Sequence, residues 1–365
     1  MAYGTVNADV IQSSVSGVSL GAGNATVFKN RIINGDMRID QRNAGASITP
    51  TNGTYSLDRW RCAATQASKY TVQQNAGSVT PPSGFINYLG VTSSSAYTII
   101  SSDVFNILQY IEGLNISDLD WGTANAKTVT LSFQVYSSLT GTFGGALRNS
   151  ATNRSYPFSY TISSANTWTQ ISVTVAGDTS GTWLTTSGIG ISVAFSLGTG
   201  STYSGTAGSW AAGDYRSATG ATSVVGTSGA TFYITGVQLE VGSLATGFEY
   251  NDYGRQLAQC QRYCWSVPPA GTYVGGWNTT TSGLVTIPLP TTMRTNPSAT
   301  FSGTFTVDAL GAAGTCTAAN TNLNAVTPQM ARVYFTVVSG ITGTVAQIIE
   351  VSPANTGVTL LSAEL

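Results

Sequence analysis

The residues from Thr231 to Gly242, TFYITGVQLEVG, decide the fold of this chain. Apolar side chains alternate with the others along this stretch, which is the period of a β-strand with one buried face. The alternation slips by one residue at Gly236, and such a slip indicates a β-bulge. The stretch therefore predicts a long, locally bent strand that lines the core of a β-protein.

A second stretch, FKNRIINGDMRIDQR from Phe28 to Arg42, stands far earlier in the chain. We interpret it as an apolar strand that is interrupted by a turn at Asn34-Gly35. The first and last strands of a jelly roll often pair side by side, so the two stretches predict one closed jelly-roll β-sandwich over residues 28–250. The closing residues of this sandwich are Phe248-Glu249-Tyr250.

The composition limits the partners that this protein can have. Charged residues make up 8% of the chain and the formal net charge is −1, so no nucleic acid or anionic membrane is attracted at long range. No apolar run is long enough to insert into a membrane. A surface with so few charges also predicts an obligate oligomer. The alternative is a monomeric β-protein whose surface is covered by Ser, Thr and Asn, so that their hydroxyl and amide groups keep it soluble.

Further stretches with period-two alternation extend the all-β pattern. The stretch 103–113 fits either a strand or a helix, and we place it in the sandwich. The expected strands of this first region are Tyr55–Arg61, 128–136, 168–175 and 190–197.

The region after the sandwich begins with the best helical pattern in the chain, over residues 251–265. Its apolar stripe consists of Tyr253, Leu257, Cys260 and Cys264, and we expect this stripe to contact other copies in the oligomer. The helix is expected to connect the jelly roll to a smaller C-terminal β-sandwich over residues 266–365. The strands expected there are 283–290, 299–307, 331–338 and 345–351.

Residues 1–27 are small, rich in Gly and Ser, and too weakly apolar to fold alone. They form either a disordered leader or an arm that becomes ordered on a partner through Val15, Val18 and Leu20. They contain neither a basic nor an apolar segment of the kind found in a secretory signal peptide, so we expect none.

Catalysis and metal binding have little support in this sequence. The chain contains no His, which excludes Ser-His-Asp and Cys-His nucleophile systems. The four Cys are too few for a disulfide framework and are expected to be buried thiols. The pair Asp118 and Asp120 fits a plain turn better than a calcium loop. We therefore expect no enzyme activity, no cofactor and no metal.

Sugar recognition needs aromatic platforms together with polar hydrogen-bonding groups. The glycine-rich loop 199–216 and the segment 271–278 offer both, and low charge favours an uncharged sugar. The alternative is that tryptophans such as Trp60, Trp168 and Trp210 are core residues. The candidate glycan contacts are Tyr203, Trp210, Asp214 and Tyr215 in the loop, and Tyr273 and Trp277 in the C-terminal region.

Four motifs carry a family resemblance. In chain order they are Asn30–Met37 (NRIINGDM), Asp58–Trp60 (DRW), Ile234–Gly242 (ITGVQLEVG) and Cys260–Tyr263 (CQRY). Together they resemble virion proteins of tailed bacteriophages, such as tail fibres and minor structural proteins, which contain a jelly roll similar to carbohydrate-binding modules. The resemblance covers residues 1–265.

The resemblance implies a homotrimer in the virion, made in the host cytoplasm. Its N-terminal arm would attach to other virion proteins and its C-terminal tip would contact the host. Related carbohydrate-binding modules often hold a calcium ion with two acidic side chains, one just after the Asn-Gly strand and one on the last strand. In this chain Arg38 stands at the first position, and Thr235 or Gly236 stands at the second. The function that we favour is non-covalent recognition of a host surface glycan. The alternatives are a purely structural part, such as a head fibre, decoration protein or tail adaptor, and a polysaccharide depolymerase.

Overall fold

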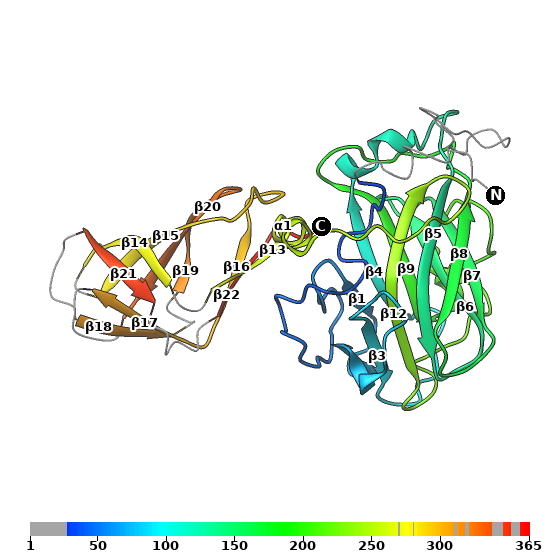
Figure 1. Ribbon diagram of the computed structural model, residues 1–365, viewed down its shortest axis with the longest axis horizontal. Coiled ribbons are helices and arrows are strands. Elements are labelled where there is room, and N and C mark those ends of the chain that lie inside the picture. The colour runs from blue at the N-terminus through cyan, green and yellow to red at the C-terminus, as the bar shows by residue number, and fades with distance from the viewer. Residues whose placement is uncertain are drawn as a thin grey trace, which may run out of the picture. The chain divides into compact units, whose positions relative to one another are not determined.

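The computed structural model describes residues 28–268, 271–279, 281–309, 312–317, 321–337, 346–351 and 358–365. Within these ranges the regular structure is almost entirely β (Figure 1). The chain divides into two compact units, Met1–Asn251 and Asp252–Leu365. The predicted arm over residues 1–27, with Val15, Val18 and Leu20, lies outside the described residues.

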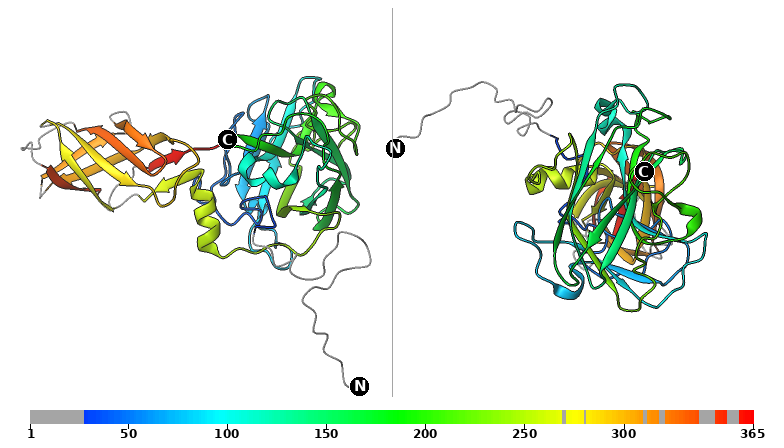
Figure 2. Two further views of the ribbon diagram at one scale, coloured as in Figure 1. Left: turned by 90° about the horizontal axis from the view of Figure 1, so that it is seen from above. Right: turned by 90° about the vertical axis from the view of Figure 1, so that its right-hand side faces the viewer.

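The first unit is a sandwich of two five-stranded antiparallel sheets (Figures 1 and 2). In spatial order, one sheet contains β1 (Arg61–Ala64), β4 (Val104–Glu112), β9 (Ile189–Thr199), β6 (Gly141–Arg148) and β7 (Ser155–Ile162). In spatial order, the other contains β2 (Tyr70–Gln74), β3 (Leu89–Ser93), β12 (Thr231–Val241), β5 (Val129–Ser137) and β8 (Thr169–Val175). The short elements are η2 (Ala76–Ser78), η3 (Gly113–Asn115), η4 (Ser117–Leu119), η5 (Ser201–Tyr203), β10 (Ser204–Gly205) and β11 (Ser217–Ala218).

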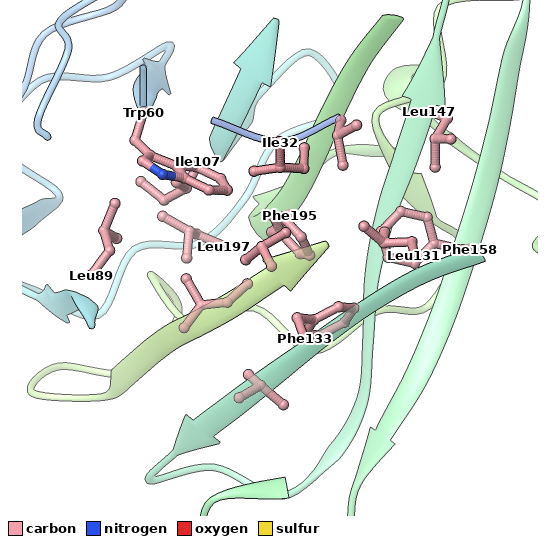
Figure 3. Close-up of a cluster of buried hydrophobic side chains, with 14 of the residues drawn as sticks. Ile32, Trp60, Leu89, Ile107, Leu131, Phe133, Leu147, Phe158, Phe195 and Leu197 are labelled. Atoms are coloured by element: carbon pink, nitrogen blue, oxygen red, sulfur yellow. The ribbon is translucent and has the colours of Figure 1, made fainter. Parts of the chain in front are cut away.

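The core lies between these two sheets and is rich in aromatic rings (Figure 3). Phe133 of one sheet meets Phe195 of the other edge to face, with ring centroids 5.0 Å apart. Both rings are fully buried, and each contributes about 1.5–3 kcal/mol through the burial of its apolar surface. The predicted jelly-roll β-sandwich is thus confirmed.

Strand β12 has the bulge that its sequence predicts. The register against β5 shifts between Thr235 and Gln238, and Gly236 adopts φ of +61° there. A Cβ at this glycine would lie 2.6 Å from the Phe85 ring. Both the left-handed backbone and the close approach require glycine.

The segment from Phe28 to Arg42 lies beside β12, as the pairing argument expects, but it is not a strand. Instead of a continuous backbone ladder, two backbone hydrogen bonds (Arg31 N–H to the Leu239 carbonyl and Val237 N–H to the Gly35 carbonyl) flank a side-chain connection. Asn30 donates to the carbonyl of Val237 at 3.0 Å and accepts from the amide of Leu239 at 3.0 Å. Because the Asn30 amide takes the place of a backbone group at the edge of β12, the segment is free to turn at Asn34 and Met37, which both adopt positive φ.

The turn at Asn34 is fixed by the DRW motif. The indole N–H of Trp60 donates to the Asn34 carbonyl at 2.9 Å, and the Asn34 side chain donates to the carbonyls of Ile39 and Asp58. The expected strand over Tyr55–Arg61 is wrong. Its ends form only an isolated bridge, and β1 begins at Arg61, because residues 56–60 are committed to these turn contacts.

The second unit begins with helix α1 (Tyr253–Gln261), visible in Figure 2 as a yellow-green coiled ribbon. Two sheets then enclose a second hydrophobic core, which confirms the smaller C-terminal β-sandwich. The three-stranded sheet is β13 (Cys264–Val267), β22 (Val358–Ser362) and β16 (Ser298–Ser302). The other sheet contains β18 (Ala312–Thr317), β17 (Thr304–Ala309), β21 (Ala346–Val351), β14 (Gly271–Trp277), β15 (Ser282–Pro288), β20 (Met330–Thr336) and β19 (Thr321–Thr327).

Two sequence expectations for this unit need correction. The helix expected over residues 251–265 ends at Gln261, because Cys264 already pairs with Ser362 in a β-ladder. The strand expected over residues 299–307 is divided at Gly303, which has φ of +76°. Its two halves, β16 and β17, belong to different sheets.

Candidate functional site

The outer face of the sheet that contains β4 and β9 gathers arginine and tyrosine side chains. Residues that pair across neighbouring antiparallel strands share one face of a sheet. Tyr110 of β4 pairs with Ser192 of β9, which pairs with Arg148 of β6. In the next row Arg61 of β1 pairs with Leu108 of β4. Core residues such as Phe195 alternate with these positions and point inward.

A loop over residues 200–219 is fastened to the same face. Its backbone bonds to the sheet edge through Ala211 and Ser155, which exchange two hydrogen bonds of 2.9 and 3.0 Å. The amide of Asn106 on β4 donates to the carbonyl of Arg216 at 3.2 Å. We name the resulting surface the arginine–tyrosine face. It consists of Arg61, Tyr110, Arg148, Ser192, Tyr203, Asp214 and Arg216.

Asp214 is the acid at the centre of this face. It accepts from Arg148, and Arg216 donates to it through Nη2 at 2.7 Å and through Nε at 3.2 Å. Burial raises the pKa of Asp214, but the hydrogen bonds and charges of both arginines outweigh this effect, and the pKa lies below its usual value. Asp214 is therefore ionised at neutral pH.

Arg148 is the buried partner in this ion pair. Only 6% of its side chain is exposed, against 28% for Arg216. Burial lowers the pKa of Arg148, and the charge of Asp214 opposes that shift. Arg148 thus pairs with Asp214 on its buried side, and Arg216 is the partner that is exposed at the surface.

Two half-buried tyrosines complete the face. The guanidinium of Arg216 lies 4.8 Å from the ring centroid of Tyr203, and that of Arg61 lies 5.5 Å from the centroid of Tyr110. Both rings pack on the apolar cluster that includes Leu108. Stacking of this kind holds each guanidinium in place without using its outward hydrogen-bond donors.

The structure brings together only part of the residue set predicted from the sequence. Tyr203 and Asp214 belong to the arginine–tyrosine face. Tyr215, on the same loop, is half-buried and lies under Gly205, whose Cβ would be 2.8 Å from the Tyr215 ring. Tyr215 therefore supports the loop.

Trp210 belongs to a different aromatic cluster. Its ring lies 5.3 Å from those of Trp121 and Trp183 and 5.2 Å from that of Tyr156. Its indole N–H donates to the carbonyl of Ala176 at 2.7 Å. These contacts agree with a structural role at the margin of the core, which is the alternative that the sequence left open.

Trp60 and Trp168 differ in burial. Trp60 is fully buried in the core, as the core interpretation predicts. Trp168 is half-buried and directly precedes β8 of the other sheet, and its indole N–H donates to the carbonyl of Thr80 at 2.8 Å.

The C-terminal candidates lie on β14. Tyr273 is half-buried against the second core, and its hydroxyl is 3.4 Å from the carbonyl of Pro268. The backbone of Trp277 pairs with Gly283, and its side chain lies outside the described part of the structure. A glycan contact at either residue stays a prediction.

The expected oligomer stripe is largely internal. Cys260 and Cys264 have no exposed surface, Leu257 is half-buried, and Tyr253 is 54% exposed. Surface for a partner is thus available at Tyr253 and, in part, at Leu257.

The residues considered for a metal have basic partners instead. Asp118 lies 2.7 Å from Arg31, and Asp120 lies 3.6 Å from Lys127. No group of three or more Cys, Asp or Glu side chains within the described ranges is arranged to hold a metal ion. Within the same ranges, no helix has the length and apolarity needed to cross a membrane.

Sequence reasoning missed Tyr110, Arg61 and Arg148. The stretch that contains Tyr110 was ambiguous between strand and helix, and its face cannot be assigned until the strand is recognised. The one available signal is the alternation Asn106, Leu108, Tyr110 within that stretch, which a strand assignment would have placed on one face.

No protein-family model matches the chain, and no curated protein matches its sequence. Among solved structures, the chain is similar to the enzymatically active domain of tailspike protein 4 of bacteriophage CBA120, at 12% identity and a TM-score of 0.34. That match covers 59% of this chain and 22% of the tailspike chain.

Carbohydrate-binding modules are also among the similar structures. The family 11 module of Clostridium thermocellum, in complex with a mixed-linked β-1,3-1,4 tetrasaccharide, has 12% identity and a TM-score of 0.28 over 55% of this chain and 98% of its own. TmCBM61, in complex with β-1,4-galactotriose, has 10% identity and a TM-score of 0.27 over 52% of this chain and 92% of its own.

Proposed function

We propose that this protein is a component of a bacteriophage virion, a tail fibre or receptor-binding part, that recognises a host surface glycan without cleaving it. The observation that carries the proposal is the arginine–tyrosine face. It combines two half-buried tyrosine rings with an ionised carboxylate and surface guanidinium groups. Aromatic rings stack on the apolar faces of sugars, and charged groups hydrogen-bond their hydroxyls.

The hydrogen bonds that hold the face together support this role. Its residues lie on strands and on a loop that is bonded to those strands at several points. A preorganised face loses little conformational entropy when a ligand binds. Recognition is therefore expected with no rearrangement of the sheet.

The assignment to a virion rests on the four motifs. The structure gives two of them a joint physical role, because the NRIINGDM segment is bonded to the ITGVQLEVG strand through Asn30. The DRW motif holds the turn of the same segment through Trp60. This arrangement supports reading the motifs as parts of one module.

A glycan array with the full-length protein tests the function. We expect binding to a subset of bacterial surface glycans and no release of reducing ends from them. Replacement of Tyr110 with Ala is expected to reduce the affinity about tenfold, because the lost stacking is worth about 1.4 kcal/mol. Thermal melts establish that each variant is folded.

Tyr136→Ala is the matched control. Tyr136 is a half-buried tyrosine on the outer face of the other sheet, where it stacks on Tyr233, so its removal is expected to leave glycan binding unchanged. A protein that joins virions and binds no glycan would be a purely structural part. Reducing-end release would identify a depolymerase.

A further inference from the structure

The charge on the arginine–tyrosine face identifies a narrower class of glycan, on the premise that the face binds glycans as proposed above. Arg148 and Arg216 share the single carboxylate of Asp214, and Arg61 adds a third positive charge to the face. Within the described residues, no carboxylate lies within ion-pair distance of Arg61. The face therefore carries an excess of positive charge in a chain whose net charge is −1.

Charges beneath the face do not remove this excess. Arg59 and Glu112 lie at or next to the same strands, and each is 1% exposed. They add one charge of each sign, so their sum is zero. The surface groups Arg61 and Arg216 thus determine which ligand charge is favoured.

Two buried hydrogen-bond donors in the same row also lack an acceptor. Within the described part of the chain, Nε of Arg148 and Oγ of Ser192 have no hydrogen-bond partner, although these residues are only 5% and 2% exposed. They are cross-strand neighbours in the register of β6 and β9. A buried donor without an acceptor is costly, so the positive charge of Arg148 is only partly compensated by Asp214.

We propose that the arginine–tyrosine face binds a saccharide that carries a carboxylate, that is, a uronic acid residue. The sugar lies over Tyr110, Tyr203 and the guanidinium groups that are stacked on their rings, and its carboxylate accepts from the guanidinium group of Arg216 or Arg61. A planar carboxylate matches the paired donors of a guanidinium, whereas a hydroxymethyl group does not. This inference replaces the uncharged sugar that the overall composition favours.

The test compares matched disaccharides that differ only at C6. Calorimetry with the full-length protein uses digalacturonate against digalactose, and diglucuronate against diglucose. We expect at least one acidic disaccharide to bind about tenfold or more tightly than its neutral match, and the difference to shrink as salt is added. Neutral sugars that bind as well as the acidic ones would overturn the acidic class and leave glycan binding intact.

If no disaccharide of either kind binds, and the glycan array is also empty, the function proposed above fails together with this inference. If the array finds neutral glycans only, the inference alone fails. These results separate the two claims.

Arg216→Gln locates the acidic contact. We expect it to weaken binding of the acidic disaccharide about tenfold and to leave that of the neutral one nearly unchanged. Lys127→Gln is the control, because it removes the same charge from a residue whose partners are Asp120 and the Asp118 carbonyl. Equal losses in both variants would indicate a general charge effect and overturn the site.

Arg61→Gln provides a second variant in case the Arg216 change disorders the loop. Arg61 lies on β1 and bonds to the Tyr110 hydroxyl at 3.4 Å, so its replacement leaves the loop contacts of Asp214 in place. A tenfold loss for the acidic disaccharide is again expected. Unchanged affinity in both arginine variants would contradict the proposal.

Discussion

At the scale of single residues, Asp214 links stability to the candidate site. It balances Arg148, whose side chain is almost entirely buried, and removal of one partner leaves a buried charge without compensation. The cost is reduced because a quarter of the Asp214 side chain is exposed. We expect Asp214→Asn to lower the free energy of unfolding by about 2 kcal/mol at pH 7.

The pH dependence of this effect has a defined sign. The pKa of Asp214 is lower in the folded protein than its usual value, so its contribution is fully present above about pH 4. That contribution disappears as the pH falls through the lower, folded pKa. Denaturant titrations at a series of pH values should therefore show the wild type and Asp214→Asn converging in acid.

The control for this measurement is Asp120→Asn. Asp120 pairs with Lys127, and both side chains are nearly half exposed, so a change within about 0.5 kcal/mol is expected. An Asp214 variant as stable as the Asp120 variant at pH 7 would refute the supporting role of the ion pair.

At the scale of elements, the segment beside β12 depends on a glycine rather than on a strand ladder. A Cβ on Gly35 would lie 2.1 Å from the carbonyl oxygen of Val237, and the amide of Val237 donates to the Gly35 carbonyl at 2.9 Å. Gly35→Ala must push the segment away from β12. We expect a loss of about 2–4 kcal/mol in the free energy of unfolding.

Gly247→Ala is the matched control, because a Cβ there meets no atom within 4 Å. Its effect is expected to stay within about 0.5 kcal/mol. Chemical denaturation of both variants compares them directly, and equal stabilities would mean that the segment is not tightly packed against β12.

The strands that could be predicted are those with a clear period-two pattern. The stretch 168–175 became β8 (Thr169–Val175), and the stretch 190–197 became most of β9 (Ile189–Thr199). Local patterns failed where long-range contacts decide the outcome. Cys264 continues a helical stripe in the sequence, but its pairing with Ser362 draws it into a sheet.

The candidate site could be predicted only in part for a related reason. Tyr203 and Asp214 stood out because a glycine-rich loop with aromatic residues indicates a binding surface. Tyr110, Arg61 and Arg148 come from three strands separated by long stretches of sequence, and only the sheet order places them together. A single sequence contains no signal for that order.

At the scale of the whole molecule, the assembly remains a prediction from the sequence. We expect the full-length protein to be an oligomer, because so few charges leave a surface prone to association, and the resemblance to phage virion proteins implies that this oligomer is a trimer. Tyr253, which is 54% exposed on α1, offers a contact point. Light scattering at micromolar concentration measures the mass, and a stable monomer would contradict the expectation.

The arm over residues 1–27 is proposed to attach the protein to other virion proteins. A variant without these residues is expected to remain folded and trimeric, with an unchanged thermal transition, and to be absent from purified particles. Incorporation at the wild-type level would show that attachment uses another part of the chain.

The most direct test of glycan recognition is a crystal structure of the full-length protein with the tightest glycan from the array. We predict sugar density on the arginine–tyrosine face, with a ring near Tyr110 or Tyr203 and a carboxylate within hydrogen-bond distance of Arg216 or Arg61. Sugar bound only at β14, beside Tyr273 and Trp277, with the arginine–tyrosine face empty, would contradict it.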